Sequence, residues 1–67
     1  MSKFRLVIAS VPYREKLVVE IWFEEIHVAE INQDGENLEI ELFDLNRIKA
    51  PLKDFQDAIE KAVKELG

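Results

Sequence analysis

Residues 17–46, which read LVVEIWFEEIHVAEINQDGENLEIELFDLN, decide the fold of this 67-residue chain. The stretch contains nine acidic residues, no basic residue, and most of the β-branched and aromatic residues of the chain. Acidic and apolar residues alternate in it at the period of two that is typical of half-buried β-strands. The stretch therefore predicts a small antiparallel sheet with a negative surface.

The length and composition predict a single domain over residues 1–67. A chain this short has room for only one small hydrophobic core. With no cysteine and 48% hydrophobic residues, it must fold without disulfide bonds or thiolate metal sites. The apolar run from Leu6 to Ala9 is too short for an export signal or a membrane span. We therefore expect a cytoplasmic protein that does not bind membranes.

The net charge of −5 is concentrated in the middle of the chain, whereas both ends are slightly basic. Binding to a phosphate backbone requires a stripe of Lys and Arg, which the acidic middle does not offer. The sequence therefore argues against direct nucleic-acid binding and allows a basic protein partner.

Predicted turns and loops divide the chain into four predicted strands, over residues 4–10, 17–23, 26–33 and 37–43. Glu24-Glu25 is the first predicted hairpin turn, and Asp34-Gly35 is the second, with the sequence of a primed two-residue turn. After Pro51, apolar residues recur every three or four positions up to Leu66, which predicts one amphipathic helix. The expected fold is α+β, a four-stranded antiparallel meander with the order ββββα and the helix packed on one sheet face.

The two turns also predict a register. Trp22 would face His27, Glu20 would face Ala29, and Val18 would face Ile31. Across the second turn, the predicted pairs are Ile31 with Leu38, Ala29 with Ile40, and His27 with Leu42. Side chains alternate between faces, so the predicted helix-covered face contains Val18, Glu20, Trp22, His27, Ala29, Ile31, Leu38, Ile40 and Leu42. The opposite face would contain Leu17, Val19, Ile21, Phe23, Ile26, Val28, Glu30, Glu39, Glu41 and Phe43.

In this arrangement both faces of the sheet carry apolar side chains. One helix covers only one face, and leaving the other in water forfeits about 25 cal/mol per Å² of apolar area. We therefore expect a second cover over the patch formed by Leu17, Val19, Ile21, Phe23, Ile26 and Val28. A homodimer is the leading hypothesis, and a different protein or the first strand are the alternatives.

Few residues offer catalytic chemistry. The only histidine, His27, shares its predicted face with Glu20 and Trp22, so a pocket with a Glu20 and His27 acid–base pair is one alternative. A satisfied, partly buried histidine is the simpler interpretation. Glu30, Glu39 and Glu41 share the other face, where a solvated acidic surface is favoured over a cation site. We predict no catalytic residue, metal or cofactor.

The run KLVVEIWFEEIHVAEINQDGENLEIELF, followed by a short amphipathic helix, resembles small uncharacterised bacterial proteins built from a β-meander and one helix. The resemblance covers residues 16–66 and implies no activity. The strand and helix order also resembles antitoxin domains of the HicB type, although the glycine-containing loop that precedes the helix there is absent between Leu45 and Pro51.

The sequence thus predicts a non-catalytic, homodimeric protein-interaction module of the adaptor, antitoxin or inhibitor type, which presents an acidic sheet surface. An inhibitor from a mobile element that imitates nucleic-acid charge is a second possibility, and a small ligand-binding protein or enzyme is a third. The predicted partner-binding residues are the acidic Glu20, Glu30, Glu39 and Glu41 and the aromatic Trp22, Phe23 and Phe43.

Overall fold

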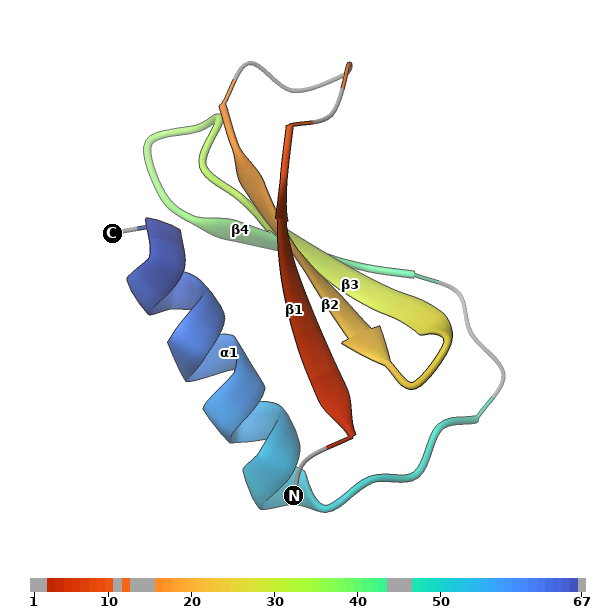
Figure 1. Cartoon of the computed structure of the whole chain (residues 1–67). Coiled ribbons are helices and arrows are strands. Elements are labelled where there is room, and N and C mark those ends of the chain that lie inside the picture. The colour runs from red at the N-terminus through yellow and green to blue at the C-terminus, as the bar shows by residue number, and fades with distance from the viewer. Residues whose placement is uncertain (1–2, 11, 13–15, 44–46, 67) are drawn as a thin grey trace.

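The computed structural model describes residues 3–10, 12, 16–43 and 47–66, in which four strands precede one helix (Figure 1). The elements are β1 (Phe4–Ala9), β2 (Val18–Phe23), β3 (Ile26–Asn32), β4 (Glu39–Leu42) and α1 (Leu52–Leu66). Each strand pairs antiparallel with the next, in the sheet order β1-β2-β3-β4. The predicted α+β class, the meander and the C-terminal helix are confirmed.

The hairpin between β2 and β3 turns at Glu24 and Glu25, as predicted, and Trp22 pairs with His27 beside it. Glu24 has a φ of 54°, a left-handed conformation that is uncommon outside glycine. The turn is held to the start of the chain, because the Glu24 amide donates to the Lys3 carbonyl at 3.1 Å and Lys3 Nζ lies 3.3 Å from Glu24 Oε1.

A β-bulge in β3 follows this turn. Ile21 pairs with Ala29 whereas Trp22 pairs with His27, so β3 has one more residue than β2 in this interval, namely Val28. One extra residue reverses the face of every later side chain relative to the partner strand.

The bulge makes the predicted register wrong beyond the turn. The observed pairs are Glu20 with Glu30 and Val19 with Ile31, each one residue away from the prediction. As a result, Glu20 and Glu30 lie side by side on one face, and Val19 and Ile31 lie side by side on the other.

The second hairpin is wider than predicted. β3 ends at Asn32 and β4 begins at Glu39, so residues 33–38 form the connection. Gly35 does not adopt the positive φ of a primed turn, and the Asp34 amide instead donates to Asn32 Oδ1 at 3.3 Å. The predicted pairs are each wrong by two residues: the observed ones are Ile31 with Ile40 and Ala29 with Leu42. Because the shift is two residues, each β4 side chain stays on the same face of the sheet relative to β3 as predicted.

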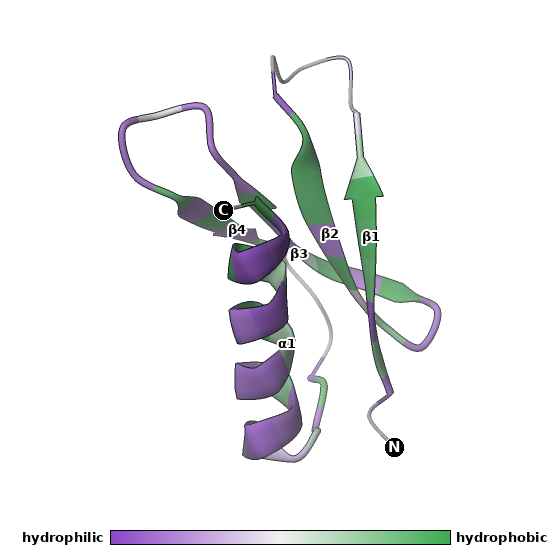
Figure 2. Cartoon of the chain, turned by 60° about the vertical axis from the view of Figure 1, so that its left-hand side comes forward, coloured by the Kyte–Doolittle hydropathy of each residue, from purple (hydrophilic) through white to green (hydrophobic). Residues whose placement is uncertain are grey.

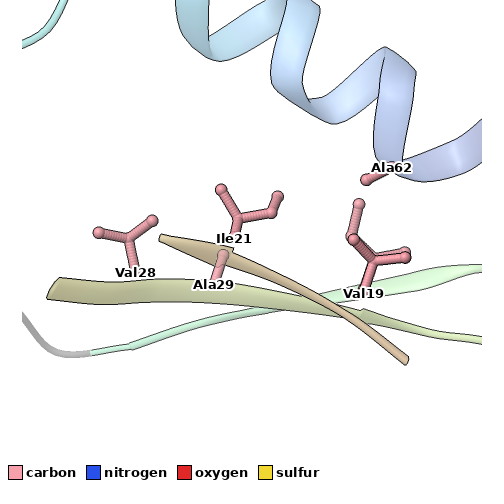
Figure 3. Close-up of a cluster of buried hydrophobic side chains, with 6 residues drawn as sticks. Val19, Ile21, Val28, Ala29 and Ala62 are labelled. Atoms are coloured by element: carbon pink, nitrogen blue, oxygen red, sulfur yellow. The ribbon is translucent and has the colours of Figure 1, made fainter. Parts of the chain in front are cut away.

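The hydrophobic core lies between α1 and the face of the sheet to which Val19 and Ile21 belong. In Figure 3 their side chains point from the sheet toward α1, where Ala62 meets them. The core consists of Val19, Ile21, Val28, Ala29, Ile31 and Ala62, bordered by Phe4, Leu6, Phe23, Ile48, Ile59 and Leu66.

The predicted helix-covered face of β2 is therefore wrong, because the bulge turned β2 over relative to β3. Val19 and Ile21, for which a second cover was expected, are 0% exposed beneath the chain's own helix, whereas Leu17 and Ile26 of the same predicted patch remain 49% and 43% exposed. The chain's own helix therefore supplies the cover over Val19 and Ile21, and these two residues need no second body.

Candidate functional site

Apolar side chains remain exposed on the helix side of β4. The helix packs against β1 and β2, and Ile40 and Leu42 of β4, predicted to lie under it, are 44% and 66% exposed. Leu52 and Val63 of α1 are 69% and 39% exposed. We call Ile40, Leu42, Leu52 and Val63 the apolar strip.

The apolar stripe of α1 is wider than its own sheet uses. Successive helical residues are about 100° apart, so Val63 points roughly a quarter turn away from the buried Ala62. Leu52, ten residues before Ala62, points to the same flank of the helix as Val63. The other flank is polar and lies beside β1, since Asp57 and Lys61 border a hollow together with Phe4 and Leu6.

One hollow lies between the apolar flank of α1 and the end of β4. Figures 1 and 2 show the start of β4 near the C-terminal end of α1. Near the other end of the helix, Leu42 and Leu52 both line a hollow of about 310 Å³. The remaining lining residues of this hollow are Phe4, Val28, Phe43, Ile48, Ala50 and Phe55.

The helix-free face of the sheet carries a row of packed groups from β1, β2 and β3, followed by Phe43, the residue after β4. The Arg5 guanidinium carbon lies 5.3 Å from the centre of the Trp22 ring. The Trp22 and His27 rings stack with centres 4.8 Å apart and planes 7° apart, and Phe43 follows at 4.7 Å from His27. This row rigidifies one end of the face.

A row of glutamates lies beside the packed row. Glu20 of β2 pairs with Glu30 of β3, which pairs with Glu41 of β4. By alternation, Glu39 lies on the same face. Four of the strand residues are thus acidic, and Arg5 is the single Lys or Arg within the strand bounds.

The structure brings most of the predicted partner-binding residues to this face. Glu39 and Glu41 are exposed, and Glu20, Trp22 and Phe43 are half-buried. Two residues need correction. Glu30 is 0% exposed and cannot touch a partner in this conformation. Phe23 lies on the helix side, with its ring centre 5.0 Å from that of Phe4.

The Glu20 carboxylate is engaged by the indole of Trp22, whose Nε1 donates to Glu20 Oε1 at 3.1 Å. His27 Nε2 is buried and has no hydrogen-bond partner within the described residues. The ring of His27 is packed between those of Trp22 and Phe43. The geometry thus gives the Glu20 carboxylate a hydrogen bond to Trp22 and places the His27 ring between two aromatic rings.

Within the described part of the chain, no group of three or more His, Cys, Asp or Glu side chains is arranged to hold a metal ion. Among the same residues, no helix has the length and apolar character needed to cross a bilayer. Sequence periodicity does not reveal the apolar strip, because it places Ile40 and Leu42 on the face that the helix covers.

Comparison with known proteins found no matching family model, curated protein or solved structure. No relative therefore indicates a function for this chain.

Proposed function

We propose that the chain is a non-catalytic protein-interaction module whose helix-free sheet face binds a basic protein. The observation that carries this proposal is the gathering of Glu20, Glu39 and Glu41 on one face beside Trp22 and Phe43. Glutamates of this kind steer and select a positively charged partner, and aromatic side chains supply contact area.

The geometry of the face favours a protein partner over a small molecule. Small-molecule sites are concave and enclose most of the ligand. Here the Trp22 and His27 rings stack, and the Phe43 ring packs against His27 with its plane tilted by 59°. Such a surface suits broad contact with another protein, as adaptors and inhibitors require.

The test is affinity capture from an extract of the native host, with quantitative mass spectrometry. The wild-type chain is compared with a double variant, Glu39→Gln with Glu41→Gln, which removes two charges and keeps side-chain shape. The matched control is Asp57→Asn with Glu60→Gln, which removes two charges from exposed positions of α1. We expect basic proteins that the wild type and the control retain and the β4 variant loses.

Trp22 offers a direct second readout, because it is the only tryptophan and lies on the proposed face. A lysine-rich peptide added to the purified chain should change its fluorescence, and the change should weaken as salt rises. Equal capture by the wild type and the β4 variant, together with a salt-insensitive fluorescence titration, would contradict the proposal.

A further inference from the structure

We propose that the free edge of β4 binds an extended segment of the basic partner as an added antiparallel strand, in which basic and apolar residues alternate. The inference rests on the proposed function, because it names the part of the basic protein that the chain recognises. A segment that joins an exposed sheet edge gains main-chain hydrogen bonds, and its alternate side chains give specificity.

The backbone of β4 presents hydrogen-bonding groups to its outer side. β4 is the last strand in the sheet order, so within the described sheet it pairs with β3 alone. The Phe43 amide donates to the Val28 carbonyl at 3.2 Å. In an antiparallel ladder, such bonded pairs alternate with pairs whose amide and carbonyl groups point outward. The outward groups of β4 are therefore those of Ile40 and Leu42, and no backbone hydrogen bond joins them to another described segment.

The side chains of β4 leave room for an added strand. All four residues, Glu39–Leu42, are exposed. The helix does not take this place, because α1 packs against β1 and β2. The edge of β4 is therefore accessible together with both of its faces.

Charge selects the chemistry of the added strand. Glu39 and Glu41 lie on the helix-free face, and Ile40 and Leu42 lie on the side of the apolar strip. Residues directly opposite one another in neighbouring strands share a face, and opposite charges paired in this way stabilise a sheet. Lysine or arginine at every second position would meet the two glutamates, and the residues between them would lie beside the apolar strip. The complement of β4 is therefore a segment with alternating basic and apolar residues.

The same charges disfavour a second copy of the chain at this edge. In any register that keeps apolar side chains on one side, β4 of another copy would bring its glutamates opposite Glu39 and Glu41. Like charges directly opposite one another destabilise a sheet. Charged residues on short edge strands also protect proteins from edge-to-edge association. A basic segment turns this repulsion into attraction.

The edge of β1 serves as an internal control. The Glu24 amide donates to the Lys3 carbonyl, so by the same alternation the outward groups of β1 include those of Leu6 and Ile8. On the helix-free face, however, β1 carries Arg5, which lies over the Trp22 ring. The β1 edge therefore offers hydrogen bonds without the negative charges that attract a basic segment.

The experiment compares two synthetic peptides of equal length and composition, added to the full chain and followed by NMR. In the first peptide lysine and valine alternate, and in the second the unit Lys-Lys-Val-Val repeats, which keeps the charge and loses the alternation. The alternating peptide should bind at least about tenfold more tightly. Because the chain itself is unchanged, no result depends on whether a variant folds.

The hydrogen bonds of the added strand have their own readout. The alternating peptide should slow exchange of the Ile40 and Leu42 amide hydrogens by about tenfold or more, with the Leu6 and Ile8 amides unchanged. In the antiparallel arrangement the valines stand opposite Ile40 and Leu42 and bond to them. Methylating the valine amides of the peptide should therefore weaken binding by about tenfold or more. Methylating the lysine amides, which point away from β4, should change affinity by about threefold or less.

Three outcomes would overturn the inference. Equal binding of the two peptides would show recognition of charge alone, and the proposed function would stand without strand addition. Equal effects of the two methylations would exclude the backbone pairing. Protection of the Ile40 and Leu42 amides in the free chain that rises with its concentration would show that a second copy occupies the edge. The proposed function itself would fail separately, in the host-extract capture and the lysine-rich peptide titration.

Discussion

The two edge strands of the sheet differ in what covers them. Phe4 and Leu6 of β1 lie half-buried against α1, whereas Leu42 of β4 is 66% exposed. A helix about 10 Å wide covers roughly two strands spaced about 4.8 Å apart. Figure 1 shows α1 beside β1, and the helix packs against β1 and β2. The last strand is therefore left largely uncovered by α1.

The largest expected effect is the difference in stability loss between truncating a buried isoleucine and truncating an exposed one. Ile21 is 0% exposed and Ile40 is 44% exposed. Ile21→Ala should lower the free energy of unfolding by about 3 kcal/mol, because it leaves a cavity beneath α1. Ile40→Ala should cost about 1 kcal/mol or less in the dilute single chain. Urea unfolding followed by Trp22 fluorescence measures both.

A loss of 3 kcal/mol is large here, since a domain of this length has a total stability of roughly 3–10 kcal/mol. Ile21→Ala is therefore expected to be partly unfolded at ambient temperature. If both variants lost similar amounts of unfolding free energy at the lowest measurable concentration, Ile40 would be buried within the single chain. That result would contradict the difference between the two edge strands.

A smaller difference in stability loss is expected between enlarging the side chains at two neighbouring helical positions. Ala62 is 0% exposed against the sheet and Val63 is 39% exposed on the apolar flank. Ala62→Leu should cost about 1–3 kcal/mol, because the added carbons push α1 away from β2. Val63→Leu should change the free energy of unfolding by about 0.5 kcal/mol or less. The measurement is urea unfolding at low concentration, and equal costs would contradict the described orientation of α1.

Local sequence patterns were sufficient to predict the elements. The Glu24-Glu25 turn, the amphipathic stripe of α1 and the order of the strands follow from periodicity and punctuation, and the structure confirms them. These features depend on residues close together in the chain. Their prediction does not depend on how distant segments of the chain pack together.

The register depended on features that leave little trace in sequence. Val28 is a β-branched residue within a strand pattern, and no sequence feature identifies it as the bulge residue. The bulge reverses the faces of β2 relative to β3. Gly35 suits a two-residue turn, yet the chain uses a six-residue connection. Because of the bulge, the prediction placed Glu20 and Trp22 on the wrong side of the sheet from Glu39 and Glu41.

The proposed strand addition uses both sides of β4, which the period of two in one short strand makes different. Glu39 and Glu41 belong to the helix-free face, and Ile40 and Leu42 belong to the apolar strip. An added strand touches both sides at once, because its own side chains alternate as well. The preference for a basic segment and the burial of apolar area therefore come from the same edge.

The smallest effect, the response to salt, should distinguish the β4 edge from the rest of a chain whose net charge is −5. Binding of the alternating peptide, measured by NMR titration, should weaken by about two- to fivefold when salt rises from low to physiological concentration, because salt screens exposed charges. The double variant Glu39→Gln with Glu41→Gln should respond less to salt, whereas Asp57→Asn with Glu60→Gln should respond as the wild type does. If both double variants lost the same part of the salt response, the net charge of the chain would attract the peptide, and the glutamates of β4 would not.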